Sequence, residues 1–163
     1  MNAIVVVDEK WGIGKNNSLL FRLKKDMAFF RQTTTDKVIV VGANTYASFP
    51  NGALPNRVNI VLDDSGRVLS DAITVKSVAE LDRVLANYNT DDIFVCGGAS
   101  VYALLLSHCK YAYVTKVAAD GGAQLFFPNL DDLQGWSLIE SGEPITDGEY
   151  KIQFCKYANN DLV

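Results

Sequence analysis

The chain has 163 residues, of which 48% are hydrophobic and 21% are charged, and its formal net charge is −4. This length and composition predict one domain, residues 1–163, with a substantial core, and they argue against disorder as the dominant state. The acidic balance argues against nucleic acid as the main partner, because phosphate backbones need a basic footprint. The chain has one histidine, and its three cysteines (Cys96, Cys109 and Cys155) form no CxxC pair, so we expect neither a disulfide framework nor a metal site.

Four apolar segments in the first two thirds of the chain predict strands. Ile4–Val7, Val38–Val41 and Ile93–Val95 are continuous apolar runs, as expected for strands buried on both faces of a sheet. Val58–Leu62 is a weaker candidate, because a polar residue interrupts its apolar run.

Helical patterns lie between these strands. One helix is predicted from Leu23 to about Thr33, and a second from Ser77 to Ala86. Ser77 is a good N-cap, and Glu80 stands three residues later, as in a capping box. A third helix is predicted after Gly98, where it carries Val101–Leu106.

The last third of the chain changes character. Lys110–Val117, Trp136–Glu140 and Glu149–Tyr157 are rich in β-branched and aromatic residues and predict strands. The turn Thr146–Gly148 precedes the last of them, so the final strands should form an antiparallel hairpin. The whole pattern predicts an α/β fold with a mostly parallel central sheet, helices on both faces and an antiparallel edge. In such sheets, ligands bind at the carboxyl ends of the strands.

Asp26 is the first candidate for chemistry. It lies on the first predicted helix beside the apolar stripe, with Leu23 three residues before it and Phe30 four residues after it. A carboxyl group in apolar surroundings has a raised pKa and can hold a proton near neutral pH. Taken alone, the spacing favours a surface carboxylate paired with Arg22 or Lys25, so both interpretations stay open at this point.

Three segments that contain glycine follow predicted strands. Trp11–Asn17 lacks the full GxGxxG spacing, and it is either a loop that covers a cofactor or a simple turn. Val95–Tyr102 places a glycine pair between a strand and a helix, where backbone N–H groups can approach a pyrophosphate. In Val41–Tyr46, the polar pair Asn44 and Thr45 either caps a helix or donates to a phosphate.

Arg57 opens the weaker strand candidate, directly after the turn Leu54–Asn56. Its guanidinium is well placed to bind a carboxylate through two hydrogen bonds. Most lone arginines are solvated, so Arg57 alone does not decide between a carboxylate-binding residue and a solvated surface residue.

The order and spacing of these segments resemble the bacterial dihydrofolate reductases from Ile4 to about Tyr157. The matching stretches are Gly12–Gly14 with Asn17, Leu23–Phe30, Gly42–Thr45, Leu54–Arg57, Val95–Tyr102, Tyr113–Thr115 and Phe127-Pro128. The resemblance implies an eight-stranded, mostly parallel sheet with an antiparallel C-terminal hairpin and four flanking helices. It also implies reduction of 7,8-dihydrofolate to 5,6,7,8-tetrahydrofolate by hydride transfer from NADPH, an activity that supports one-carbon metabolism and thymidylate synthesis.

The resemblance gives roles to individual residues on the substrate side. Asp26 matches the only acidic side chain of the family's pterin pocket. It would hydrogen-bond the pterin ring, with Thr115 as second partner, and promote protonation at N5, beside the C6 atom that takes the hydride. Arg57 matches the arginine that binds the α-carboxylate of the folate glutamate. The other substrate-binding positions implied are Val6, Met27, Phe30, Phe49 and Cys96.

On the cofactor side, the resemblance implies a flexible loop that closes over the nicotinamide and a glycine pair joined by a cis peptide bond. The loop contains Ile13, Asn17, Ser18 and Leu19, of which Leu19 also matches a pocket-lining position, and the pair is Gly97-Gly98. The further cofactor-binding positions implied are Gly42, Ala43, Asn44, Thr45, Ser48, Leu62, Asp63, Asp64, Ala99, Ser100, Val101 and Tyr102.

The sequence departs from the family pattern near the reacting end of the site. Phe21 stands where the family often has Trp, and Lys24 stands where it usually has Pro. Ala123-Gln124 replaces a Gly-Asp pair that is common in the family and steadies the mobile loop. The family's modes of proton delivery and loop closure therefore do not carry over at these positions.

A further departure concerns the cofactor. The family usually gathers basic or hydroxyl side chains around the 2′-phosphate of NADPH, whereas the matching positions here are Ala43, Asp64 and Ser100, with Asp63 adjacent. Two carboxylates would repel that phosphate but could accept hydrogen bonds from a free ribose 2′-hydroxyl. We therefore expect NADPH as the cofactor and add the hypothesis that NADH is also accepted, while nearby Arg67 could restore phosphate binding.

Two other functions stay open. One is the related pyrimidine reductase of riboflavin synthesis, which shares the fold and the nicotinamide cofactor, and the other is a nucleotide-binding module without catalysis. Asp26 and Leu54–Arg57 favour folate, and turnover of dihydrofolate separates all three. We expect a monomer in the cytoplasm with no membrane partner, because no apolar run is long enough to cross a bilayer and the N-terminus lacks a basic lead and a cleavage site.

Overall fold

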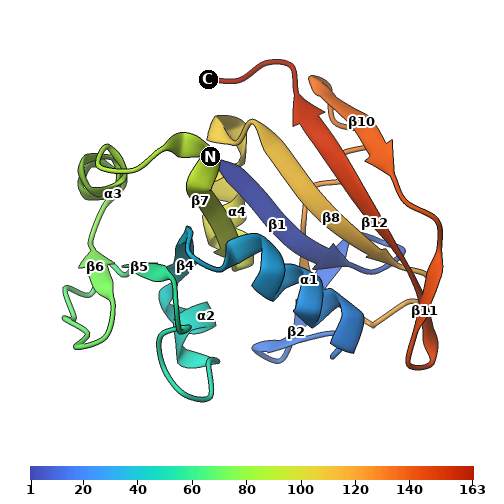
Figure 1. The fold of residues 1–163 in the computed structure, drawn as a ribbon, viewed down its shortest axis with the longest axis horizontal. Coiled ribbons are helices and arrows are strands. Elements are labelled where there is room, and N and C mark those ends of the chain that lie inside the picture. Colours follow the sequence, from blue (N-terminus) through green and yellow to red (C-terminus); the bar gives the residue numbers. More distant parts are fainter.

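The computed structural model describes all 163 residues, which are arranged around one twisted sheet (Figure 1). Eight strands lie side by side in the order β10-β12-β8-β1-β7-β4-β5-β6, and β11 pairs in addition with β12. The pairs from β8 to β6 are parallel, whereas β12 runs antiparallel to β8, β10 and β11. The predicted mostly parallel sheet with an antiparallel C-terminal hairpin is therefore confirmed. The strands are β1 (Asn2–Val7), β4 (Val38–Gly42), β5 (Val58–Leu62), β6 (Ile73–Val75), β7 (Ile93–Gly97), β8 (Tyr111–Val117), β10 (Trp136–Ser141), β11 (Ile145–Asp147) and β12 (Tyr150–Asn159).

Burial on both faces explains the continuous apolar runs in the parallel strands. Every residue of β4 is buried, and successive side chains point to opposite faces of the sheet. Ile39 packs with Ile4 and Phe94 on one face, whereas Val38 and Val40 belong to the larger core on the other face.

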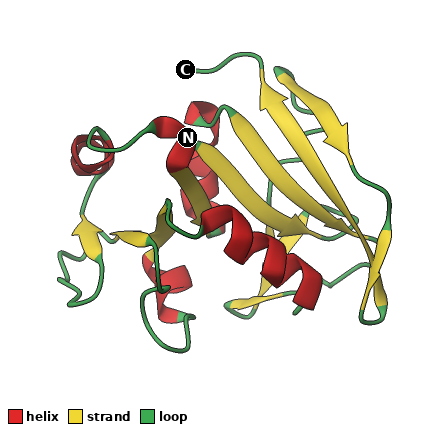
Figure 2. Ribbon diagram, viewed as in Figure 1, coloured by secondary structure: helices red, strands yellow, loops and turns green.

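The four expected helices cover these two faces (Figure 2). Helix α1 (Lys24–Thr34) lies on one face, and α3 (Val78–Leu85) and α4 (Ala99–Leu105) lie on the opposite face, while the short α2 (Ala43–Ala47) follows β4 directly. None of the helices is long and apolar enough to cross a membrane. Two short 3-10 turns, Thr90–Asp92 and Leu106–His108, complete the helical structure.

Helix α3 begins as predicted. The Ser77 hydroxyl oxygen accepts a hydrogen bond from the Glu80 N–H at 3.2 Å, so Ser77 caps the helix. The Glu80 carboxylate accepts from the N–H of Lys76 at 2.8 Å, one residue before the position that a standard capping box uses.

The segment after β1 is more regular than the sequence indicated. Residues predicted as a loop form β2 (Gly12–Lys15) and β3 (Ser18–Leu19), and β2 pairs on its other side with β9 (Leu125–Phe126). The two strands of the hairpin are joined by Asn16 and Asn17, which both have positive φ angles. This small sheet holds the expected cofactor loop against a segment more than 100 residues later.

Candidate active site

The candidate site begins as a cavity where α1 crosses the carboxyl ends of β1 and β8. Val6 of β1 and Thr115 of β8 are register partners and lie beneath the helix. The cavity has a volume of about 90 Å³, and Asp26 is its only acidic lining residue. Its lining residues are Val6, Ile13, Leu19, Leu20, Phe21, Arg22, Leu23, Asp26 and Met27.

Asp26 is held by a neutral donor in these apolar surroundings. The buried Thr115 hydroxyl donates to Asp26 Oδ1 at 2.7 Å. Burial raises the pKa of Asp26 from its ordinary value of 3.8 to about 6, the Thr115 bond lowers it, and the negative charge of Asp147 raises it. Asp26 forms no ion pair with Arg22 or Lys25, so the interpretation as a surface ion pair is wrong. The carboxyl group can therefore hold a proton near neutral pH.

Arg57 lies against Phe30, one helical turn along α1 from Asp26, and has no carboxylate partner within the chain. Its guanidinium carbon lies 5.8 Å from the ring centroid of Phe30, and its Nε atom is buried without a hydrogen-bond partner. Burial lowers the pKa of Arg57. A buried, unpaired guanidinium N–H is costly, and a bidentate carboxylate would satisfy it.

The remaining predicted substrate positions, Cys96, Met27 and Phe49, lie at different distances from the cavity. Cys96 packs with Phe30 against the Ile4 cluster, and burial raises the pKa of its thiol, so it is a protonated wall residue. Met27 is 56% exposed at the open side of the cavity. Phe49 lies farther out, edge-on to Tyr46 at 6.2 Å.

The glycine turns gather at the carboxyl ends of the neighbouring strands β4 and β7. The Gly97-Gly98 peptide bond is cis, as the resemblance implied. A Cβ atom on Gly98 would lie 3.3 Å from Thr45 Oγ1, and one on Gly42 would lie 3.0 Å from a Val101 methyl group. The starts of α2 and α4 therefore approach each other closely, and the backbone N–H groups of their first turns have no partner within the helices. This arrangement suits the phosphates of a dinucleotide.

Several predicted cofactor residues turn their side chains away from this edge. Tyr102 is buried, and its hydroxyl donates to the Ile4 carbonyl at 2.6 Å. Leu62 packs against the main core, and the Ser48 hydroxyl donates to the Thr45 carbonyl at 2.6 Å. These residues pack behind the edge. Ala43, Asn44, Ala99 and Ser100 lie at the edge itself, in the first turns of α2 and α4. Asn17 lies on the exposed turn between β2 and β3, and Ser18 is the exposed first residue of β3.

Asp63 differs from the expectation that two carboxylates face the ribose. Its Oδ1 accepts from the Ser65 N–H at 3.0 Å, and its Oδ2 lies 3.3 Å from Arg67. These contacts, the Ser65 bonds first, lower the pKa of Asp63. A Cβ atom on Gly66 would lie 3.4 Å from Lys76 Cε, so a second basic side chain reaches the same turn.

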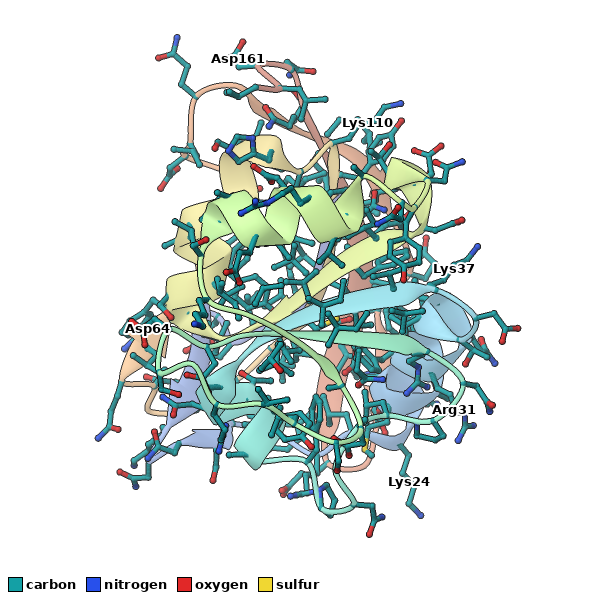
Figure 3. The ribbon with its side chains drawn as sticks, turned by 90° about the vertical axis from the view of Figure 1, so that its left-hand side faces the viewer. Lys24, Arg31, Lys37, Asp64, Lys110 and Asp161 are labelled. Atoms are coloured by element: carbon teal, nitrogen blue, oxygen red, sulfur yellow. The ribbon has the colours of Figure 1, made fainter.

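Asp64 alone of this acidic pair lies free at the surface (Figure 3). The turn after β5 therefore presents one exposed carboxylate and two basic side chains, Arg67 and Lys76. Asp63 and Asp64 differ for a local reason. The Asp63 carboxylate accepts a hydrogen bond from the Ser65 N–H and pairs with the Arg67 guanidinium, and these contacts hold it within the turn.

The altered residues before Phe127-Pro128 still contact the loop. Gln124 accepts from the Asn16 N–H through its side-chain oxygen at 3.0 Å, and its own N–H donates to the Gly14 carbonyl at 2.8 Å. The buried Asp8 carboxylate accepts from the N–H groups of Gly12 at 2.7 Å and Gly121 at 2.9 Å. A neutral amide thus takes up the contact, and the loop remains tied to this segment.

Other residues of the site were missed by the sequence analysis. Leu20, Arg22 and Leu23 line the cavity. Phe21, which the sequence indicated only as a departure from the family pattern, also lines it and packs edge-on against Tyr150 at 4.9 Å. The apolar lining could have been found from the run of apolar residues before the helix. Asp147, which contacts the start of α1, had no local signal, because it lies more than 120 residues away in sequence.

Comparison with known proteins agrees with this arrangement. A family model described as dihydrofolate reductase matches residues 1–159. The dihydrofolate reductase of Enterococcus faecium is 33% identical over 92% of this chain and 91% of its own length. That of Bacillus subtilis (strain 168) is 31% identical over 94% of this chain and 91% of its own length. A solved structure of dihydrofolate reductase from Enterococcus faecalis, complexed with NADP(H) and RAB-propyl, superposes with a TM-score of 0.83 at 28% identity, covering 98% of this chain and 96% of that one.

Proposed function

The chain belongs to the dihydrofolate reductase family, and we propose from this premise that Asp26 is its proton-holding group. The protein reduces 7,8-dihydrofolate to 5,6,7,8-tetrahydrofolate with NADPH, which selects the folate reductase among the three functions that the sequence left open. One observation supports this role of Asp26: its carboxyl group is the only acidic group that lines an apolar cavity, and it accepts a hydrogen bond from the Thr115 hydroxyl.

Asp26 and its neighbours bind and orient the pterin ring. One carboxyl oxygen accepts from Thr115, so the other is left for the substrate and for the proton that N5 needs. The apolar lining, including Val6 and Met27, packs on a flat ring and excludes water. With its pKa at about 6, a fraction of Asp26 remains protonated at neutral pH, and a general acid works best in this range.

Arg57 binds the glutamate end of the substrate in this proposal. Its buried, unpaired Nε and its position over Phe30 favour a bidentate bond to a carboxylate. Phe30, Phe49 and Cys96 provide the apolar wall between that carboxylate and the pterin ring.

Bound NADPH supplies the hydride. The backbone at Gly42 and Gly97-Gly98, with the Thr45 hydroxyl, would hold the phosphates, because these groups meet where two helices begin. Arg67 and Lys76 would bind the 2′-phosphate, since both basic side chains reach the turn after β5 while Asp63 is drawn inward. We therefore propose that NADPH is preferred over NADH.

The organisation of the chain follows the same reasoning. We propose that residues 1–163 act as one domain and as a monomer, because every residue of the site comes from one chain and one continuous sheet joins its parts. The three cysteines are free, which supports a reducing, cytoplasmic location. Light scattering on the purified protein should give a mass near 17.9 kDa, and a multiple of that mass would contradict the monomer.

The test of the reaction is the loss of reduced-nicotinamide absorbance on adding dihydrofolate, with NADPH and NADH in parallel. Asp26→Asn should lower turnover at neutral pH by about 10²–10⁴-fold, as expected for loss of a general acid. The difference in turnover between Asp26→Asn and the wild type should become smaller in acid, where protons from the solvent can replace the proton that Asp26 supplies. Asp82→Asn, an exposed substitution on α3, is the matched control and should retain full activity.

Two outcomes would contradict the proposal. A folded wild-type protein that binds NADPH without turning over dihydrofolate would contradict the reaction. An Asp26→Asn variant with unchanged turnover at neutral pH would contradict the role of Asp26.

A further inference from the structure

Helix α1, which carries Asp26, begins without a capping side chain of its own. Leu23 occupies the N-cap position in an extended conformation and makes no side-chain cap hydrogen bond. The first N–H groups of a helix have no partner within it, and in a partly buried helix they need one from elsewhere. The cap of α1 therefore has to come from another part of the chain.

Asp147, at the end of β11, supplies this cap. Its Oδ2 atom accepts from the N–H of Lys25 at 2.8 Å and from the N–H of Asp26 at 3.3 Å. The Lys25 ammonium group donates to the Thr146 carbonyl at 2.6 Å, so a second bond joins the same two elements. Asp147 is 4% exposed, and the carboxylate is compensated by these donors and by the positive end of the helix dipole.

The contact acts directly on the residue that holds the proton. The backbone N–H of Asp26 is bonded to Asp147, and its side chain is bonded to Thr115 of β8. Two elements of the C-terminal half of the chain thus fix the backbone and the carboxyl group of one residue. A cap supplied by a neutral serine would fix the backbone equally well but would bring no charge.

We propose that Asp147 is a positioning residue for the reduction, which fixes the first turn of α1 through hydrogen bonds from two of its N–H groups and so places its own carboxylate next to Asp26. The inference rests on the proposed role of Asp26 as the proton-holding group. It assigns to the β11–β12 hairpin, far from the cavity in sequence, a part in setting the proton affinity of the site.

Electrostatics agree with this geometry. The charge of Asp147 raises the pKa of Asp26, in the same direction as burial. No lysine or arginine forms an ion pair with either carboxyl group, so the charge of Asp147 is not cancelled by a direct partner. The other titratable groups on the elements around the pair are Arg22 directly before α1, Lys24, Lys25 and Arg31 on α1, Tyr102 on α4, Tyr111, Tyr113 and Lys116 on β8, and Tyr150, Lys151, Cys155, Lys156 and Tyr157 on β12.

The experiment compares Asp147→Asn and Asp147→Ala with the wild type. The asparagine oxygen still accepts from the helix N–H groups but carries no charge, whereas alanine removes both the cap and the charge. Asp131→Asn is the matched control, because that carboxylate also accepts two side-chain hydrogen bonds, from Lys116 and Tyr157. Two readouts are taken between pH 4 and 9: the rate of dihydrofolate reduction, and the titration of the Asp26 carboxyl carbon by NMR in the free protein.

Removal of a neighbouring negative charge favours the ionised form of Asp26 and so lowers its pKa. In Asp147→Asn, the titration midpoint of Asp26 and the alkaline limb of the rate profile should both move to lower pH. A displacement of about half a pH unit would lower the rate about threefold above pH 7 and leave it unchanged in acid. Asp147→Ala should show the same displacement together with a lower rate at all pH values, and Asp131→Asn should show neither.

An unmoved Asp26 midpoint in both Asp147 variants, even with a lower melting temperature, would reduce Asp147 to a structural cap and overturn the inference. Failure of the proposed function would give a different result. If the proposed function is wrong, the wild type itself does not turn over dihydrofolate, and the NMR titration still reports whether Asp147 changes the pKa of Asp26.

Discussion

Asp26 and Asp63 are two aspartates near the same edge of one sheet, and the protein shifts their pKa values in opposite directions. Asp26 has one neutral donor, the Thr115 hydroxyl, and burial raises its pKa to about 6. Asp63 receives the N–H of Ser65 and the guanidinium of Arg67, and these partners lower its pKa. Burial thus dominates the proton affinity of Asp26, whereas hydrogen-bond donors dominate that of Asp63.

The difference matches the two tasks of the cleft. The Asp26 end needs a group that can carry a proton beside a flat apolar ring. In the proposed function, the Asp63 end needs a carboxylate that stays ionised, holds Arg67 in place and leaves a basic surface for the 2′-phosphate of NADPH. The following variants test whether the two carboxyl groups differ in this way.

The largest effect is expected for the stability of Asp26→Asn. Because the folded-state pKa of Asp26 lies above the ordinary value of 3.8, the wild type loses stability as pH rises from about 4 through about 6. Asparagine keeps the bond from Thr115 without the buried charge. The variant should therefore be more stable than the wild type by up to about 3 kcal/mol at pH 8 and equal to it near pH 4. Urea unfolding at the two pH values measures this, and an equal difference at both would show that burial of the charge is not the cause.

A smaller effect is expected for Arg67→Ala, which removes the basic side chain that Asp63 holds. The KM for NADPH should rise about tenfold, while the KM for NADH stays unchanged. A tenfold change corresponds to the lower end of the free energies of hydrogen bonds to charged groups, as expected for a half-exposed arginine. Arg83→Ala on α3 is the matched control and should change neither value. Equal loss with both cofactors would place Arg67 away from the 2′-phosphate.

The smallest effect is expected for Asp63→Asn. The amide oxygen can still accept from Ser65, so only the ion pair with a half-exposed arginine is lost. Because the pKa of Asp63 is lowered, its carboxylate contributes stability above its ordinary pKa, and this contribution disappears in acid. Calorimetry should give a slightly lower melting temperature at pH 7 and no difference at pH 3. A variant that melts higher at pH 7 would show that Asp63 resembles Asp26.

The regular parts of the fold were predictable because their signals are local. The strand Val58–Leu62 was predicted with the bounds that the structure gives, and Ser77 caps α3 as its position indicated. The strands β2, β3 and β9 were not predicted, because they contain two to four residues each and are formed by pairing between distant segments. A two-residue strand has no periodicity to detect.

The site follows the same rule. The position of Asp26 on its helix was visible in the sequence. Its spacing alone favoured a surface ion pair, whereas the family resemblance implied a pocket acid with Thr115 as second partner of the ring. The packing of α1 over β8 brings the Thr115 hydroxyl to its carboxyl group. The orientation of Asp63 depends on the Ser65 N–H, which composition does not reveal. Asp147 reaches α1 through a hairpin at the far end of the chain, so no local pattern could indicate it.

The proposed mechanism requires the free protein to hold a proton on Asp26 close to neutral pH. Carbon NMR of protein labelled at aspartate, with Asp26→Asn used to assign the signal, measures the titration of this carboxyl group directly. We expect a midpoint near 6, with the signal of Asp63 titrating below the ordinary range. A midpoint for Asp26 at or below 3.8 would contradict the account, because the carboxyl group would then be ionised throughout the range in which the enzyme must supply a proton.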